Sequence, residues 1–486
     1  MPRLIVLAAL AMPACTFLYN PDNLPEATDA RAIDAVPIDA DPSQLTLTGI
    51  TPSTIDEGTG ADDGRPALLL LAGASLVGTA TVTVTIEGVA EPIAIPAGDV
   101  AVSADGTLAG VAVRIPVIAD LRDGDPRTLT VTVTQGATSK SITGTVTGLD
   151  ELILTGTTDA AGLRPRYAQI TVAGDAHLTG TTAARLVATG GMTLTGVLDV
   201  DASGTSPGPG GCGGGPPATA APCSPGGGEA GAPNAILGGV GGGGGGSFGT
   251  VGTPGANNST GQGAPGQASG DPSLVPLAAQ ANRGAGGGGG ANPTIGSGGS
   301  GGAGGGTILI STGGALIVGA DGGIRARGGD GTAPSGSGGG GGSGGAILIR
   351  PGAAITVGRA WATAPGGLGG SASSGDGGDG GLGRIRIDTA RADARTIGGP
   401  DTYAGPSWLP ATPVLVATQP TLTVRGTGSL SMAVNAGAPT TITIGAAGTA
   451  QFSPQLTPGA NQVCASIGTG GEAESLACVD LFYTGG

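Results

Sequence analysis

The sequence contains few of the residue types from which catalytic and binding sites are usually built. Of its 486 residues only 2% are aromatic and 11% are charged, with one histidine, His177, and one lysine, Lys140. A single histidine argues against a histidine-based metal site or catalytic triad. The formal net charge of −15 would repel nucleic-acid phosphates, and few aromatic rings are available to stack on bases. We therefore expect no nucleic-acid partner.

Glycine and proline are abundant instead. They number 103 and 36, together 139 of 486 residues, which is more than twice the usual share of about 12%. Glycine follows no strict three-residue period, and this excludes a collagen helix. Sixty-eight of the glycines lie between residues 201 and 386, so the excess belongs to the centre of the chain.

The first residues, MPRLIVLAALAMPAC, predict export. Arg3 precedes an apolar run, Leu4 to Met12, which is too short to span a bilayer and ends in small residues. The cysteine that follows, Cys15, makes this segment resemble the lipobox of bacterial lipoproteins. The resemblance implies a signal peptide over residues 1–14 and a diacylated Cys15 as the first mature residue. The alternative is plain secretion, with cleavage at an Ala-x-Ala such as Ala9 to Ala11.

Residues 15–43 are expected to form an acidic, disordered tether. Six acidic residues face one arginine between residues 20 and 43, where there are also four prolines. Such a segment cannot form a core and stays extended; it also lacks the spacing of a calcium-binding loop. Lipoproteins with Asp directly after the lipidated cysteine are associated with retention in the inner membrane. Because Thr16 stands there, the resemblance implies the outer membrane.

Residues 44–148 predict an immunoglobulin-like β-sandwich. Apolar and polar residues alternate in short runs separated by Gly, Pro and Asp, which is typical of half-buried strands. About seven such runs in roughly 105 residues suit this fold. The opening segment LTGITPSTIDEG, followed by LLLLAGASLVG, is similar to the start of a TIG-type immunoglobulin-like domain. The runs include 45–47, 68–71, 82–86, 111–115, 129–133 and 142–146.

Residues 152–398 predict a glycine-rich β-solenoid, similar to a parallel β-helix. Three strand-like words of four residues begin at Thr307, Ala346 and Arg384, 39 and 38 residues apart. After the first two, a second word of the same kind begins at Ala315 and Ala354. A fixed period that contains several short strands is the signature of stacked repeats.

The glycine tracts would loop out on one side of the solenoid. They could be flexible, because the entropy of loop closure grows only slowly with loop length. They could also pack on one another as extended polyglycine helices. The sequence does not decide between these two arrangements.

Residues 411–486 predict a second immunoglobulin-like sandwich, so that the whole fold is all-β. The word FSPQLTPGANQVCAS resembles the late strands of bacterial immunoglobulin-like domains. Cys464 and Cys478 would then join neighbouring strands. About 75 residues is small for a sandwich, and a disulfide compensates for a small core.

Four cysteines besides Cys15 suggest disulfides, because an even number is usual in exported proteins. Three connectivities are possible. Proximity in the sequence favours disulfides between the two central cysteines and between the two C-terminal ones. Closing a loop of about 12–15 residues would contribute roughly 3 kcal/mol to the stability of the fold. A four-cysteine metal site is the alternative, but Cys-x₂-Cys spacing is absent. The candidates are Cys212 with Cys223 and Cys464 with Cys478.

No residue is predicted to be catalytic, to bind a cofactor or to ligate a metal. Gly-x-Gly-x-x-Gly matches are uninformative in glycine tracts, and Gly-x-Ser-x-Gly at Ser343 lacks a later histidine. Gly-Gly-Asp-Gly at Asp330 and Asp379 faintly resembles calcium-binding nonapeptides without their tandem period. His177 is expected to be an ordinary strand residue. The arginines expected to face solvent on the solenoid strands are Arg325, Arg327, Arg350, Arg384 and Arg386.

Lipobox, Asp-Ala tether and glycine-rich repeats together resemble a class of surface lipoproteins of high-GC Gram-negative bacteria. The resemblance covers nearly the whole chain and implies an outer-membrane lipoprotein on the cell surface; a periplasmic or secreted protein is the alternative. We expect a non-enzymatic structural or adhesive role, with surface polysaccharide or other cell-surface proteins as partners. The rival hypothesis is a carbohydrate-active lyase or hydrolase on the β-helix, which would cluster carboxylates on one face.

Overall fold

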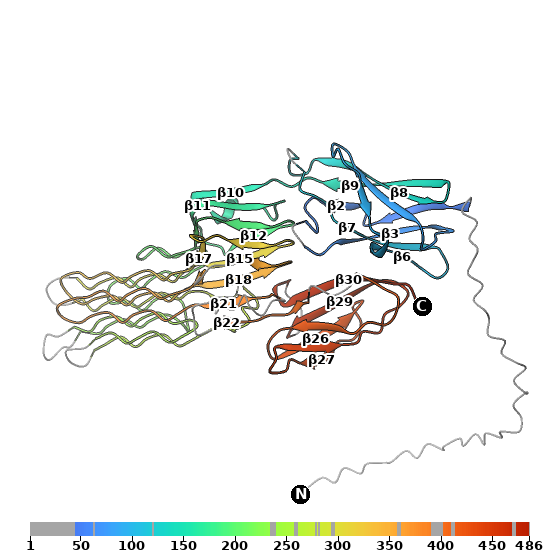
Figure 1. Cartoon of the computed structure of the whole chain (residues 1–486). Coiled ribbons are helices and arrows are strands. Elements are labelled where there is room, and N and C mark those ends of the chain that lie inside the picture. The colour runs from blue at the N-terminus through green and yellow to red at the C-terminus, as the bar shows by residue number, and fades with distance from the viewer. Residues whose placement is uncertain are drawn as a thin grey trace, which may run out of the picture. The chain divides into compact units, whose positions relative to one another are not determined.

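The computed structural model (Figure 1) describes residues 44–486 except 62–63, 119–120, 234–239, 257–260, 278, 280–281, 293–296, 357–360, 390–401, 410–413, 469–472 and 486. The expected signal peptide and tether, with Cys15, lie outside the described residues. The described part is all-β, as expected: its strands form six sheets, and its helical segments are short 3-10 turns. Within this part, no helix has the length and apolar character needed to cross a membrane.

Residues 44–148 fold as two facing sheets with one hydrophobic core between them. In β8, Leu129, Val131 and Val133 are buried, while the threonines between them lie on the other face. The two-layer arrangement was expected; the immunoglobulin-like topology stays a prediction. The sheets are β1 (Thr46–Thr51), β3 (Ala67–Ala74), β7 (Leu108–Val113), β6 (Val100–Val102), and β2 (Thr54–Asp56), β9 (Thr138–Thr147), β8 (Pro126–Gln135), β4 (Thr81–Ile86), β5 (Ile93–Ile95).

The next part of the chain stacks parallel strands into two sheets (Figure 1). One sheet has the order β12-β15-β18-β21-β22, and the other is built from β10, β11 and the pairs of short strands that follow. The bounds are β10 (Leu152–Asp159), β11 (Ile170–Thr179), β12 (Ala184–Ala188), β13 (Met192–Leu194), β14 (Val197–Asp199), β15 (Thr307–Thr312), β16 (Leu316–Val318), β17 (Gly323–Arg325), β18 (Ala346–Pro351), β19 (Ile355–Thr356), β20 (Ala362–Thr363), β21 (Arg384–Ile387) and β22 (Thr402–Tyr403).

The repeat seen in the sequence corresponds to the register in which the strands of this stack pair. Thr307 lies opposite Ala346, and Ala346 lies opposite Arg384, so the three expected words pair residue by residue. The stack continues through β22, a few residues beyond the expected end at 398. Parallel stacking in register is the arrangement on which a solenoid depends.

Both faces of the sheet that contains β15 and β18 are buried. Ile308 and Ile347 belong to the core between the two solenoid sheets. Leu309 and Leu348 belong to a separate cluster on the opposite face, where Phe248 from the glycine-rich segment packs. Strands buried on both faces read as continuous apolar runs, and this explains the words Ile-Leu-Ile.

Residues 407–485 form two further sheets around a third core. The core includes Trp408, which lies before the expected start of this domain at 411. A Cβ added to Gly110 in β7 would lie 2.5 Å from the Phe482 ring, so this domain packs closely on the first sandwich. The sheets are β23 (Ser407–Trp408), β25 (Leu422–Arg425), β28 (Thr449–Phe452), and β24 (Leu415–Val416), β30 (Leu476–Tyr483), β29 (Gly459–Ile467), β26 (Ser429–Val434), β27 (Thr440–Thr443).

Glu57 joins the first sandwich to the start of the solenoid. Its side chain is buried and accepts hydrogen bonds from the backbone N–H groups of Leu149, at 2.6 Å, and Ile118, at 2.9 Å. Its backbone carbonyl accepts a hydrogen bond from Thr189 Oγ1 at 2.6 Å. Burial raises the pKa of Glu57 above its ordinary value, and the two backbone hydrogen bonds only partly oppose this effect.

We predict that Glu57→Gln changes the pH dependence of thermal stability. A raised pKa in the folded state means that the folded protein binds the proton more tightly than the unfolded chain. The contribution of Glu57 to stability is therefore present below pH 4.5 and is lost as the pH rises through the folded pKa. The melting temperature of the wild type, relative to the variant, should fall between pH 4 and pH 7. A constant difference over this range, measured by circular dichroism, would contradict the assignment.

Candidate functional site: the glycine bundle and the charged ladder beside it

The glycine tracts pack on one another as extended helices; we call this assembly the glycine bundle. In the tract 338–345 the backbone N–H groups point in three directions that recur every third residue. This is the three-residue turn of the polyproline II conformation, which has no internal hydrogen bonds. Residues 338, 341 and 344 donate to tract 375–381, residues 339, 342 and 345 to tract 326–332, and residues 340 and 343 to tract 285–288, at 2.8 to 3.0 Å.

The carbonyl groups of the same tract accept from three further tracts. Residues 243 and 246 donate to it from one tract, 302 and 305 from a second, and 367 and 370 from a third. The tract 338–345 therefore has six hydrogen-bonded neighbours. Of the two arrangements that the sequence left open, the packed one is present.

The spacing of the tracts leaves no room for side chains between them. A Cβ added to Gly340 would lie 2.1 Å from the carbonyl oxygen of Gly244, and one added to Gly342 would lie 1.9 Å from that of Ala303. Contacts this short do not occur, so glycine is required at these positions. By contrast, a Cβ added to Gly213 would meet nothing within 4 Å.

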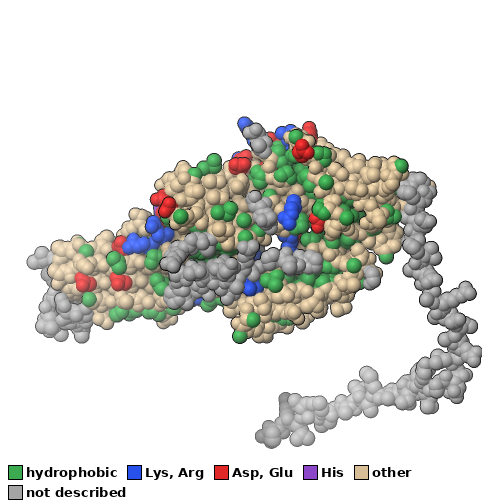
Figure 2. Space-filling view, in the orientation of Figure 1, with side chains coloured by type: hydrophobic (Ala, Val, Ile, Leu, Met, Phe, Trp, Pro, Cys, Tyr) green, Lys and Arg blue, Asp and Glu red, His purple; other side chains and the backbone are tan. Residues whose placement is uncertain are grey.

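The face of the bundle visible in Figure 2 is almost entirely backbone and uncharged side chains, with few acidic residues. The sequence raised Asp330 and Asp379 of the glycine bundle as weak candidates for calcium ligands. Each instead accepts a hydrogen bond from a neighbouring tract: Asp330 from Leu368 N at 2.7 Å and Asp379 from Gly369 N at 2.8 Å. Among the described residues no group of three or more His, Cys, Asp or Glu side chains is placed to hold a metal ion.

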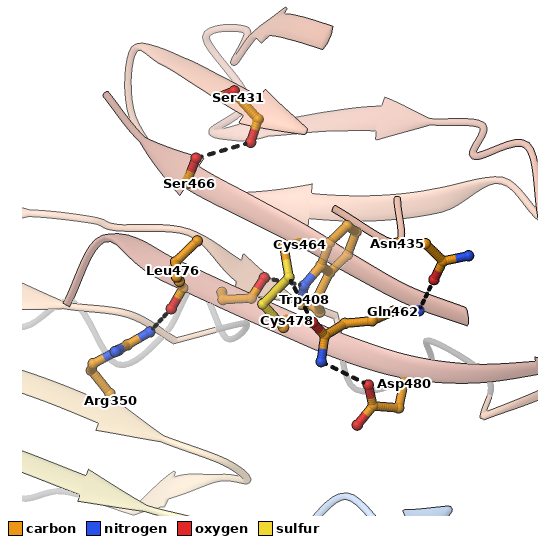
Figure 3. The surroundings of a disulfide bond; sticks show 11 residues. Arg350, Trp408, Ser431, Asn435, Gln462, Cys464, Ser466, Leu476, Cys478 and Asp480 are labelled. Atoms are coloured by element: carbon orange, nitrogen blue, oxygen red, sulfur yellow. Dashed lines mark hydrogen bonds between the residues drawn. A yellow bond between two sulfur atoms is a disulfide. The ribbon is translucent and has the colours of Figure 1, made fainter. Parts of the chain in front are cut away.

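Both favoured disulfides are present. Cys212 and Cys223 are joined within the glycine bundle. Cys464 and Cys478 lie directly opposite each other in β29 and β30, with Cα atoms 4.1 Å apart, so they link neighbouring strands as expected (Figure 3). Trp408 lies beside this disulfide, and its indole N–H donates to the carbonyl of Ala477 at 2.8 Å.

Ionisable side chains form a ladder across three solenoid strands. His177 in β11 lies opposite Asp199 in β14, which lies opposite Arg325 in β17. His177 pairs with Asp199 through Nδ1, and Arg325 pairs with both Asp199 and Asp201. His177 is thus a strand residue, as expected, with a carboxylate partner that its sequence neighbours do not reveal.

The ladder carries one carboxyl group with a raised pKa. Burial raises the pKa of Asp201, the nearby Asp199 adds to this effect, and hydrogen bonding to Arg327 N and the charge of Arg325 oppose it. Paired carboxylates with different environments are a feature of glycosidases. Each carboxylate here is held by an arginine or histidine, which is the usual state of a structural ion-pair network.

The expectation that the solenoid arginines face solvent is wrong for two of them. Arg384 and Arg386 are 8% and 0% exposed. They follow the apolar column of β15 and β18 on the face that the glycine-rich segment covers, and the Arg384 guanidinium lies over the Phe248 ring. Arg350 is mostly buried, with its side chain 21% exposed and paired with Asp388. Arg325 in the ladder and Arg327 close to it remain partly exposed, at 45% and 35%.

Arg386 is tolerated in this buried position because its guanidinium makes four hydrogen bonds. It donates to both carboxylate oxygens of Asp388, at 2.8 and 2.6 Å, and to the carbonyls of Ser273 and Glu474, at 2.6 and 2.7 Å. These bonds join β21, the glycine-rich segment and the C-terminal domain. The sequence feature that could have predicted this ion pair is the spacing Arg-x-Asp at residues 386–388, because residues two apart lie on the same face of a strand.

The comparisons with known proteins add no family to this description. No protein family, no curated protein and no solved structure matches the chain.

We predict that Gly342→Ala destabilises the bundle whereas Gly213→Ala does not. The added methyl group at residue 342 must push two tracts apart, and overpacking of this kind costs about 1–3 kcal/mol. At residue 213 the methyl group has open space, and the change should stay within about 0.5 kcal/mol. Thermal melting of the two variants and the wild type measures the difference. Equal melting temperatures for all three would contradict the packed arrangement.

Proposed function

We propose that the chain is a lipid-anchored protein of the bacterial outer membrane, displayed on the cell surface, with a structural or adhesive role and no enzymatic activity. The observation that carries this proposal is the glycine bundle. Its interior consists of backbone groups bonded to other backbone groups, so its extended shape does not depend on a hydrophobic core of its own. Such an element suits a load-bearing or exposed part of the cell envelope.

A hydroxyl-bearing face on the first sandwich suits the adhesive form of this role. On the solvent side of its five-stranded sheet, Thr83 lies opposite Thr132, which lies opposite Ser141. The next row repeats this pattern with Thr85, Thr130 and Thr143. Regular rows of hydroxyl groups can donate and accept hydrogen bonds, which matches the chemistry of a polysaccharide surface.

We predict that protease treatment of intact cells removes the wild-type protein. Cys15→Ala should prevent lipidation, so that this variant is released or retained as precursor. Thr16→Asp should leave the protein attached to the membrane and protected from protease, because the lipoprotein resemblance links Asp at that position to inner-membrane retention. Immunoblots of shaved cells and membrane fractions measure all three. A wild-type protein that resists shaving on intact cells would contradict surface display.

The charged ladder favours one second candidate, a carbohydrate-active enzyme on the solenoid. The raised pKa of Asp201 beside Asp199 is the observation in its favour. The ion pairs that occupy both carboxylates count against it.

We predict no release of reducing ends or unsaturated uronates from acidic or neutral polysaccharides incubated with the purified protein. Cleavage that Asp201→Asn abolishes, while Asp330→Asn in the glycine bundle leaves it unchanged, would favour the enzyme instead.

A further inference from the structure

A cavity of about 510 Å³ lies where the first sandwich, the solenoid and the C-terminal domain meet. Its wall includes Arg65 before β3, Thr312 at the end of β15, Arg350 at the end of β18, and Trp408 with Cys478 from the C-terminal domain. The volume falls within the range of small-molecule sites, which also commonly lie between domains. Three of the lining residues, Arg350, Trp408 and Cys478, are labelled in Figure 3.

Arg65, which is one of the lining residues, carries an unused hydrogen-bond donor. Its Nη1 is buried and has no hydrogen-bond partner among the described residues. Burial lowers the pKa of Arg65, and the negative charge of Asp480 partly opposes this effect. Asp480 acts through its charge and not through a hydrogen bond to Arg65. A buried guanidinium N–H without an acceptor is unfavourable, and an anionic oxygen would supply the acceptor.

The charges around the cavity favour an anion. Arg65 and Arg350 line it, together with one carboxylate, Asp388. That carboxylate already binds both the Arg386 guanidinium and Arg350. Arg350 also donates to the carbonyl of Leu476. The two arginines outnumber the one carboxylate among the lining residues. Asp480 and Glu474 lie close enough to act on Arg65 and Arg350, but they do not line the cavity.

The remaining wall has the mixture of groups that suits a sugar. Ser311, Thr312 and Ser407 contribute hydroxyl groups, and Trp408 contributes an aromatic side chain. The Thr312 hydroxyl donates to the carbonyl of Gly314, which leaves its lone pairs available as acceptors. Hydroxyl groups match the hydroxyls of a pyranose, and an aromatic ring offers an apolar surface to its C–H groups.

We propose that this cavity binds a hexuronic acid or a similar acidic sugar, with the carboxylate against Arg65 and Arg350 and the ring among the hydroxyls and Trp408. The planar guanidinium matches the two oxygens of a carboxylate. This site goes beyond the structural or adhesive role proposed above and does not depend on it, since a periplasmic or secreted protein would carry the same cavity.

The test is isothermal titration calorimetry of the full-length protein with glucuronate, glucose, acetate and inorganic phosphate. Glucuronate should bind at least tenfold more tightly than each of the other three, because only glucuronate has both the carboxylate and the pyranose ring. Weaker or equal affinity of glucuronate relative to acetate or phosphate, or no heat with glucuronate, would overturn the proposal.

Variants connect the binding to the cavity. Arg65→Ala should weaken glucuronate binding at least tenfold. Arg65→Lys should weaken it by less, because lysine keeps the positive charge but cannot donate a bidentate pair of hydrogen bonds. The control is Arg164→Ala, an exposed arginine that pairs with Asp123 and Asp150 outside the cavity. It should leave the affinity unchanged. Folding of each variant is checked by its melting temperature, and unaltered glucuronate affinity in folded Arg65→Ala and Arg65→Lys would overturn the assignment.

Discussion

The close approach of glycine backbones is the constraint on which the rest of this structure depends. With no side chains between them, neighbouring tracts reach hydrogen-bond distance in several directions at once, as around residues 338–345. Glycine loses more conformational freedom on folding than any other residue, so ordering these tracts is costly. The interior of the bundle has little apolar surface to offset this cost. The backbone hydrogen bonds and close packing must do so, and they can form only if the tracts are held in register.

The solenoid supplies that register. Each coil holds the two ends of a glycine tract at fixed positions, because β15, β18 and β21 pair in parallel with matched residues. In return, the glycine-rich segment covers the outer face of the same sheet, where Phe248 packs with Leu309 and Leu348. Arg386 fastens this face to the C-terminal domain through buried hydrogen bonds. The bundle and the solenoid therefore stabilise each other.

The sequence was sufficient for features that depend on local pattern. The 38- and 39-residue spacing gave the stacked strands and their register, alternation gave the sandwich strands, and proximity gave both disulfides. It was insufficient where distant segments meet. From the sequence alone, Arg384 and Arg386 are expected to face solvent. In the fold, Phe248 packs against Arg384 and the carbonyl of Glu474 accepts a hydrogen bond from Arg386, and both contacts come from distant parts of the chain. The packing of the glycine tracts and the position of Arg65 at a three-way junction depend on the same long-range contacts.

Amide hydrogen exchange of the glycine tracts tests the central claim most directly. If the tract 338–345 is enclosed by six hydrogen-bonded neighbours, its amides should exchange much more slowly than those of exposed glycines such as Gly98 and Gly428, and as slowly as those of the solenoid strand β18. Mass spectrometry of deuterated peptides provides this comparison. Exchange of residues 338–345 at the rate of an unstructured chain would contradict the account, because it would mean that the tracts are not packed in solution.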